Sequence, residues 1–111
     1  MSEGLALTDQ YRKAQFGTAI EIAAASVGTG FTKQGTLNHN ACIVVIYSNL
    51  DQPVWLSFGS GNQELVVPAG GLFTLDLKAS HMAMAKNTPI LIKRVTVSPT
   101  TGNLFFSYVG V

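Results

Sequence analysis

The sequence predicts an all-β fold, a single antiparallel β-sandwich or jelly roll preceded by an N-terminal arm. Short apolar runs rich in β-branched residues recur along the chain, and "ACIVVIYS" (41–48) is the strongest of them. Turn residues separate these runs at a spacing of roughly 8 to 12 residues, which is typical of sandwiches. A chain of 111 residues fits one domain. We therefore expect an arm over residues 1–18 and one β-sandwich domain over residues 19–111.

The first 18 residues differ from the rest because their apolar side chains are scattered without strict alternation. One interpretation is a short helix over residues 9–15, with Thr8 as its cap. The other is an extended arm that orders only against a partner. The residue pattern does not distinguish between the helix and the extended arm.

Strand patterns begin at residue 19. The segment 19–27 alternates around Glu21, and 28–40 is typical of a turn, a weak edge strand and a second turn. Residues 41–48 are apolar on both faces, which favours a central strand. "SNLDQP" (48–53) supplies the turn that ends it.

The second half continues the same pattern. "GSGN" (59–62) is typical of a hairpin loop, because glycine tolerates the positive φ angles of tight turns. In "LFTLDLK" (72–78), Phe73, Leu75 and Leu77 are predicted to face the core and Thr74, Asp76 and Lys78 the solvent. The remaining strands are predicted at 54–58, 64–67, 90–97 and 104–111, which makes seven or eight in all.

Charge is sparse, and its distribution limits the partners. Charged residues form 12% of the chain, against a typical value of about 25%, and the net charge is +1. The cations include two adjacent pairs, Arg12 with Lys13 and Lys93 with Arg94, and the others are dispersed. We therefore expect neither direct nucleic-acid binding nor membrane binding. A neutral surface favours contact with other proteins.

The single cysteine, Cys42, excludes an internal disulfide and lies among aliphatic neighbours, so we expect it to be buried. No secretory signal and no apolar run of about 18 residues is visible. We expect synthesis in a reducing compartment.

No catalytic constellation is predicted. The six acidic residues fall singly on predicted arm, strands and turns. His39 and Cys42 lie close together in "HNAC", but a metal site usually needs three or four ligands, so exposed turn histidines are expected instead. Nucleophile-elbow and phosphate-loop spacings are missing from the sequence. We expect no enzymatic activity, no cofactor and no metal.

Aromatic residues on predicted strands are expected to pack in the core. They are Trp55, Phe58, Phe73, Phe105 and Phe106. For Tyr47 and Trp55, which flank the turn at 48–53, an alternative interpretation is that their rings are exposed and form a platform for a sugar.

The order of segments in the second half resembles that of a known family. "YSNLDQPVWLSF", a Gly-rich hairpin, "ELVVPAGGLFTLDLKA", "ILIKRV" and "PTTGNLFFSYVG" together are similar to capsid decoration proteins, also called staple or cement proteins, of tailed bacteriophages. The resemblance covers roughly residues 41–111.

This resemblance implies a structural virion protein, made in the host cytoplasm, that binds the outer capsid surface and bridges neighbouring subunits. Its partner would be the major capsid protein, and a homodimer would suit the two-fold positions of the shell. The capsid contacts would lie in the arm, with apolar anchors Leu5, Leu7, Tyr11 and Phe16 and polar contacts Arg12 and Lys13. Alternatives are a tail or fibre β-sandwich module of a phage virion and a carbohydrate-binding module.

Overall fold

The computed structural model describes residues 14–110. Most of the expected capsid contacts lie outside these residues, namely Leu5, Leu7, Tyr11, Arg12 and Lys13. Most of the segment 9–15, for which a helix and an extended arm were the two interpretations, also lies outside them. The strands are β1 (Gln15–Phe16), β2 (Ile20–Ala23), β3 (Thr32–Thr36), β4 (Ile43–Ser48), β5 (Val54–Ser57), β6 (Leu65–Val67), β7 (Gly71–Asp76), β8 (Pro89–Arg94) and β9 (Asn103–Gly110). Two single-turn 3₁₀ helices, η1 (Ala24–Ser26) and η2 (Lys78–Ser80), complete the elements.

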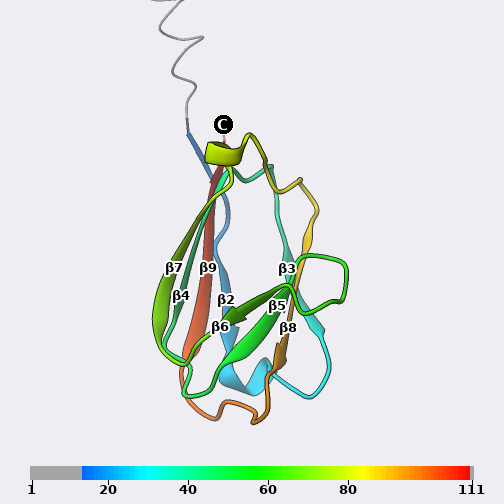
Figure 1. Ribbon diagram of the computed structural model, residues 1–111, viewed down its shortest axis with the longest axis vertical. Coiled ribbons are helices and arrows are strands. Elements are labelled where there is room, and N and C mark those ends of the chain that lie inside the picture. The colour runs from blue at the N-terminus through cyan, green and yellow to red at the C-terminus, as the bar shows by residue number, and fades with distance from the viewer. Residues whose placement is uncertain (1–13, 111) are drawn as a thin grey trace, which may run out of the picture.

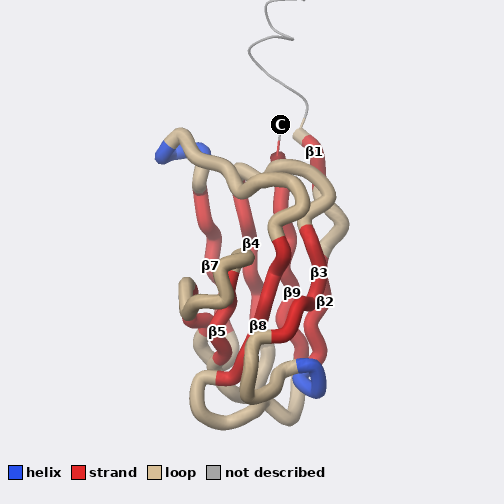
Figure 2. The backbone as a smooth tube through the Cα atoms, turned by 90° about the vertical axis from the view of Figure 1, so that its right-hand side faces the viewer, coloured by secondary structure: helices blue, strands red, loops and turns tan. Residues whose placement is uncertain are grey.

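These strands form two antiparallel sheets, so the all-β prediction is confirmed. The five-stranded sheet has the order β1-β9-β4-β7, with β2 also paired to β9, and the four-stranded sheet has the order β3-β8-β5-β6. Figures 1 and 2 show the two sheets as separate layers. Nine strands are described instead of seven or eight, and the two-residue β1 was not foreseen.

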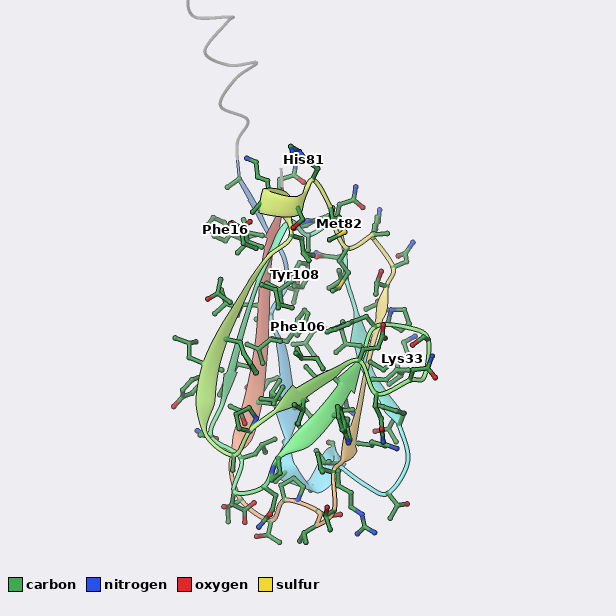
Figure 3. All side chains as sticks on the ribbon, in the orientation of Figure 1. Phe16, Lys33, His81, Met82, Phe106 and Tyr108 are labelled. Atoms are coloured by element: carbon green, nitrogen blue, oxygen red, sulfur yellow. The ribbon has the colours of Figure 1, made fainter. Side chains whose placement is uncertain are left out.

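The inner faces of the two sheets enclose one hydrophobic core. Phe106 on β9 is fully buried, and its ring lies 6.2 Å from that of Phe58 and 6.1 Å from that of Tyr108. In Figure 3 the side chains of Phe106 and Tyr108 point into the space between the layers. The four-stranded sheet contributes fully buried aliphatic side chains from β5 and β8, including Leu56 and Ile92.

Strand β4 is central, as its apolar pattern predicted, because it pairs with β7 on one side and β9 on the other. Strand β3 lies at an edge, also as predicted. In β7, Phe73 and Leu75 pack against the core while Thr74 and Asp76 are exposed, which confirms the expected alternation within the strand. Cys42 is buried, as expected.

The turn after β5 uses glycine as predicted, with φ of 104° at Gly59 and 78° at Gly61. Glu64 holds this loop in place, because its Oε1 accepts hydrogen bonds from Phe58 N at 2.7 Å and from the hydroxyl groups of Ser60 and Ser57 at 2.9 and 3.1 Å. The pKa of the Glu64 carboxyl is lowered chiefly by the N–H of Phe58 and further by the two hydroxyl groups, whereas burial acts in the opposite direction.

At the start of the described chain, β1 pairs with β9 in the register Gln15↔Gly110 and Phe16↔Val109. The segment expected to be an arm over residues 1–18 therefore includes two residues that belong to the five-stranded sheet. Gly17 follows directly, and its N–H donates to Tyr108 O at 2.9 Å.

Candidate interaction surface

The outer face of the five-stranded sheet carries a group of exposed and half-buried apolar side chains. We call these side chains the apolar face. Its members are Phe16, Ile43, Val45, Tyr47, Leu72, Phe105 and Val109. They share this face because they alternate with buried residues: on β4, Tyr47 lies between Ile46 and Ser48, both buried.

The pairing register joins these side chains into one surface. At the end of the sheet that is uppermost in Figure 1, Phe16 lies beside Val109, and Val109 lies beside Ile43. At the lower end, Tyr47 lies between Phe105 and Leu72. Directly paired side chains on one sheet face are in contact distance of one another, so the apolar residues extend across four strands.

A shallow groove indents the upper part of the apolar face. Its lining is almost entirely apolar and comes from Phe16, Ile43, Val45, Ser107, Tyr108 and Val109. Its volume is about 110 Å³. Pockets for small molecules and cofactors usually exceed roughly 300 Å³, so the groove has the size to receive an apolar side chain.

Exposure is high for several members of the apolar face. Phe16 is 81% exposed, Leu72 68% and Tyr47 46%. The rings of Tyr47 and Phe105 stack, with centroids 6.1 Å apart and planes inclined by 21°. Exposed apolar residues that form one contiguous group mark surfaces that bind other macromolecules more often than isolated ones do.

Two acidic side chains lie beside the apolar residues of this face. Glu21 on β2 accepts a hydrogen bond from Asn103 Nδ2 at 2.6 Å, and Asp76 at the end of β7 accepts one from Ala79 N at 3.1 Å. Both carboxylates are exposed, and each already has a protein donor. The centre of the face is uncharged, so covering it desolvates little charge.

Of the residues predicted to contact a partner, Phe16 is the one that the structure describes, and it lies at the upper border of the apolar face. In Figure 3 its side chain points away from the core. Tyr47, which the sequence singled out for a sugar platform, lies on the same face. The structure adds Ile43, Val45, Leu72, Phe105 and Val109 to these two residues.

The predicted sugar platform is not formed, because Tyr47 and Trp55 lie on different sheets. Tyr47 belongs to the outer face of the five-stranded sheet, whereas Trp55 on β5 pairs with Lys93 and Val66 in the four-stranded sheet. Both residues alternate with buried neighbours, so their rings point to opposite sides of the molecule.

Expectations for the aromatic residues were correct in part. Phe106 is fully buried, and Phe58 and Phe73 pack against the core. Trp55 and Phe105 face outward instead. Phe105 and Phe106 are consecutive in one strand, so period-two alternation places only one of them in the core.

The two histidines differ from each other. His81 is exposed and has a φ of 57°, as suits a turn. His39 is half-buried, its Nδ1 lies 2.7 Å from Asn40 O, and its ring packs against Tyr108, so the expectation of solvent exposure was wrong for His39. The nearby Cys42 Sγ donates to Val109 O at 3.4 Å. Within residues 14–110, no group of three or more metal-ligating side chains occurs.

A signal for the apolar face was present in the sequence. Residues 41–47 are all apolar, so both faces of this strand carry apolar side chains. Only one of the two faces of a sheet is needed to form the core. The second apolar row, Ile43, Val45 and Tyr47, is therefore the one left outside.

No protein-family model, curated protein or solved structure matches the chain. In the part that the structure describes, no helix has the length and apolar character required to cross a membrane.

Proposed function

We propose that this protein is a structural component of a tailed-phage virion that binds the outer surface of the icosahedral capsid and bridges neighbouring capsid subunits. The observation that carries this proposal is the apolar face, which extends to Phe16 near the start of the described residues. The two sheets act as a β-sandwich body of the jelly-roll type, and residues 1–13 act as the arm.

Support for a protein partner comes from the chemistry of this face. Its centre is uncharged, and its groove has a volume of about 110 Å³, which suits a side chain of the major capsid protein. The rings of Tyr47 and Phe105 supply the aromatic area that is enriched in protein interfaces.

Simultaneous binding by arm and body increases avidity. Once the body is bound, the arm searches only a small volume, so its effective concentration at the capsid is high. Leu5, Leu7 and Tyr11 are the proposed apolar anchors of the arm, and Arg12 and Lys13 are its proposed polar contacts. Phe16 on β1 is the proposed anchor next to the arm. A homodimer at a two-fold position would double the number of contacts.

Co-sedimentation of the purified protein with phage shells that lack it tests this function. We expect saturation at a fixed number of copies per capsid subunit. A chain that begins at Ala14 is the matched variant: it keeps β1 and lacks only the arm. We expect it to fold and to bind more weakly.

Equal binding of both chains would refute the role of the arm. Absence of binding by the full chain would refute capsid decoration, and binding to purified tails instead would identify a tail or fibre module.

Sugar binding is less well supported. A carbohydrate platform carries exposed rings surrounded by amide and carboxylate side chains. The stacked pair of Tyr47 and Phe105 has such groups on one side, where Glu21 pairs with Phe105 and accepts a hydrogen bond from Asn103. On the other side its neighbour is Leu72.

A further inference from the structure

The four sheet edges differ in how they avoid pairing with another chain. An exposed edge strand presents free N–H and C=O groups, and proteins usually protect it with lysine, proline, a bulge or short length. Strand β3 carries Lys33 and a register shift between Lys33 and Gly35. Strand β6 has three residues and is followed by Pro68. The edge made by β1 and β2 is interrupted between Phe16 and Ile20.

Strand β7 has none of these protections. It is six residues long, and neither proline nor lysine nor a register shift occurs in it. Its only pairing within residues 14–110 is with β4, and it forms the left border of the sheet in Figure 1. Its one charge is at the last residue, Asp76.

The free groups of this edge come from alternate residues. Leu77 N donates to Cys42 O at 2.9 Å, so Leu77 faces β4. Because residues of an antiparallel strand face alternate neighbours, Leu75 and Phe73 also direct their N–H and C=O groups toward β4. Leu72, Thr74 and Asp76 consequently direct theirs outward, and none of these groups has a partner among the described residues.

We propose that β7 pairs with β7 of a second copy, antiparallel and in the register that places Thr74 opposite Thr74. This register forms three hydrogen-bonded pairs, Leu72 with Asp76, Thr74 with Thr74 and Asp76 with Leu72, and so uses every free group of the strand. A two-fold register centred on Phe73 or on Leu75 forms only two such pairs. The Thr74 register also keeps the two Asp76 carboxylates apart, and threonine opposite threonine is a favourable cross-strand pair.

The symmetry of this contact determines where the apolar faces lie. Antiparallel pairing of two edges has its two-fold axis perpendicular to the sheet, so the outer faces of both copies point to the same side. The two apolar faces then lie on the same side of the dimer, on either side of a junction formed by Thr74 paired with Thr74 and by Leu72 paired with Asp76. The pairing holds whether or not the partner of that combined surface is a capsid.

Sedimentation equilibrium of the full chain, with Thr74→Pro as the main variant, tests the proposal. Proline removes the outward N–H of residue 74 and no bond to β4. We expect the unmodified chain to have about twice the mass of the 11.8 kDa chain and Thr74→Pro to have the single mass. Thr36→Pro is the matched control. Thr36 lies on edge strand β3, and Leu37 N donates to Thr88 O, so the N–H of Thr36 also points outward. It should stay dimeric.

A pair of charge variants covers the case in which Thr74→Pro does not fold. Thr74→Lys and Thr74→Glu each place like charges opposite one another and should each weaken the dimer at least about tenfold, while an equimolar mixture should restore it. A full chain of single mass, or a dimer that persists in the Thr74 variants, would overturn the proposal. A dimer that does not bind shells would overturn the proposed function alone.

Discussion

Gly17 lies directly against the ring of Tyr108, and no space for a side chain remains between them. The same tyrosine accepts the N–H of Gly17 at its carbonyl, and its hydroxyl donates to Asn38 Oδ1 at 2.5 Å. One residue of β9 thus fixes both the beginning of the described chain and the loop before β4.

We predict that Gly17→Ala destabilises the protein by about 1 to 3 kcal/mol, because the added methyl group overlaps the ring and displaces β1 or Tyr108. Gly30→Ala is the control, since a methyl group there meets no atom within 4 Å. Urea unfolding measures both. Equal midpoints for the two variants would show that β1 does not lie on Tyr108.

Two adjacent phenylalanines allow a comparison within one strand. We predict that Phe106→Ala lowers the free energy of unfolding by about 3 to 5 kcal/mol, because it leaves a cavity in the core. Phe105→Ala removes only an outward ring and its stacking on Tyr47, so it should cost no more than about 1.5 kcal/mol. Similar losses in denaturant unfolding would contradict the inward and outward assignment.

Binding through the apolar face predicts a specific loss. Tyr47→Asp places a charge between Phe105 and Leu72 on that face and should reduce shell binding strongly while leaving the melting temperature nearly unchanged. Val66→Asp is the control, since Val66 is 43% exposed, close to the 46% of Tyr47, and lies on the other sheet. Co-sedimentation measures binding, and equal loss in the two variants would exclude the apolar face as the contact.

The carboxylate of Glu64 predicts an acid-dependent stability. Its pKa is lowered from 4.5 in the folded protein, chiefly by the N–H of Phe58. A carboxyl group with a lowered folded pKa stabilises the fold above its unfolded pKa, and this contribution is lost as the pH falls through the folded value. Glu64→Gln should therefore show a shallower loss of stability below pH 4.5 in urea titrations. Parallel profiles for the variant and the unmodified protein would disprove this role.

The local residue patterns predicted where the strands lie. They did not predict which strands pair with one another or which of the two sheets each strand joins. The apolar residues of β4 identified a central strand, and the alternation of β7 identified its core-facing residues. Placing Tyr47 and Trp55 on opposite sheets required knowledge that β4 and β5, although consecutive, do not pair. A turn between two strands is compatible with a hairpin and with a change of sheet, and its residues do not distinguish the two.

Strand β9 is the last of the strands within residues 14–110 and lies inside the five-stranded sheet, where it pairs with β1, β2 and β4. During synthesis, the earlier strands of that sheet therefore wait without their common neighbour until residue 110 has left the ribosome. The buried row of β4, which includes Val44 and Ile46, lacks its neighbour Phe106 over this interval, which is when nascent chains aggregate most readily. A chain that lacks β9 therefore has no complete core, because Leu104, Phe106 and Tyr108 all come from this strand.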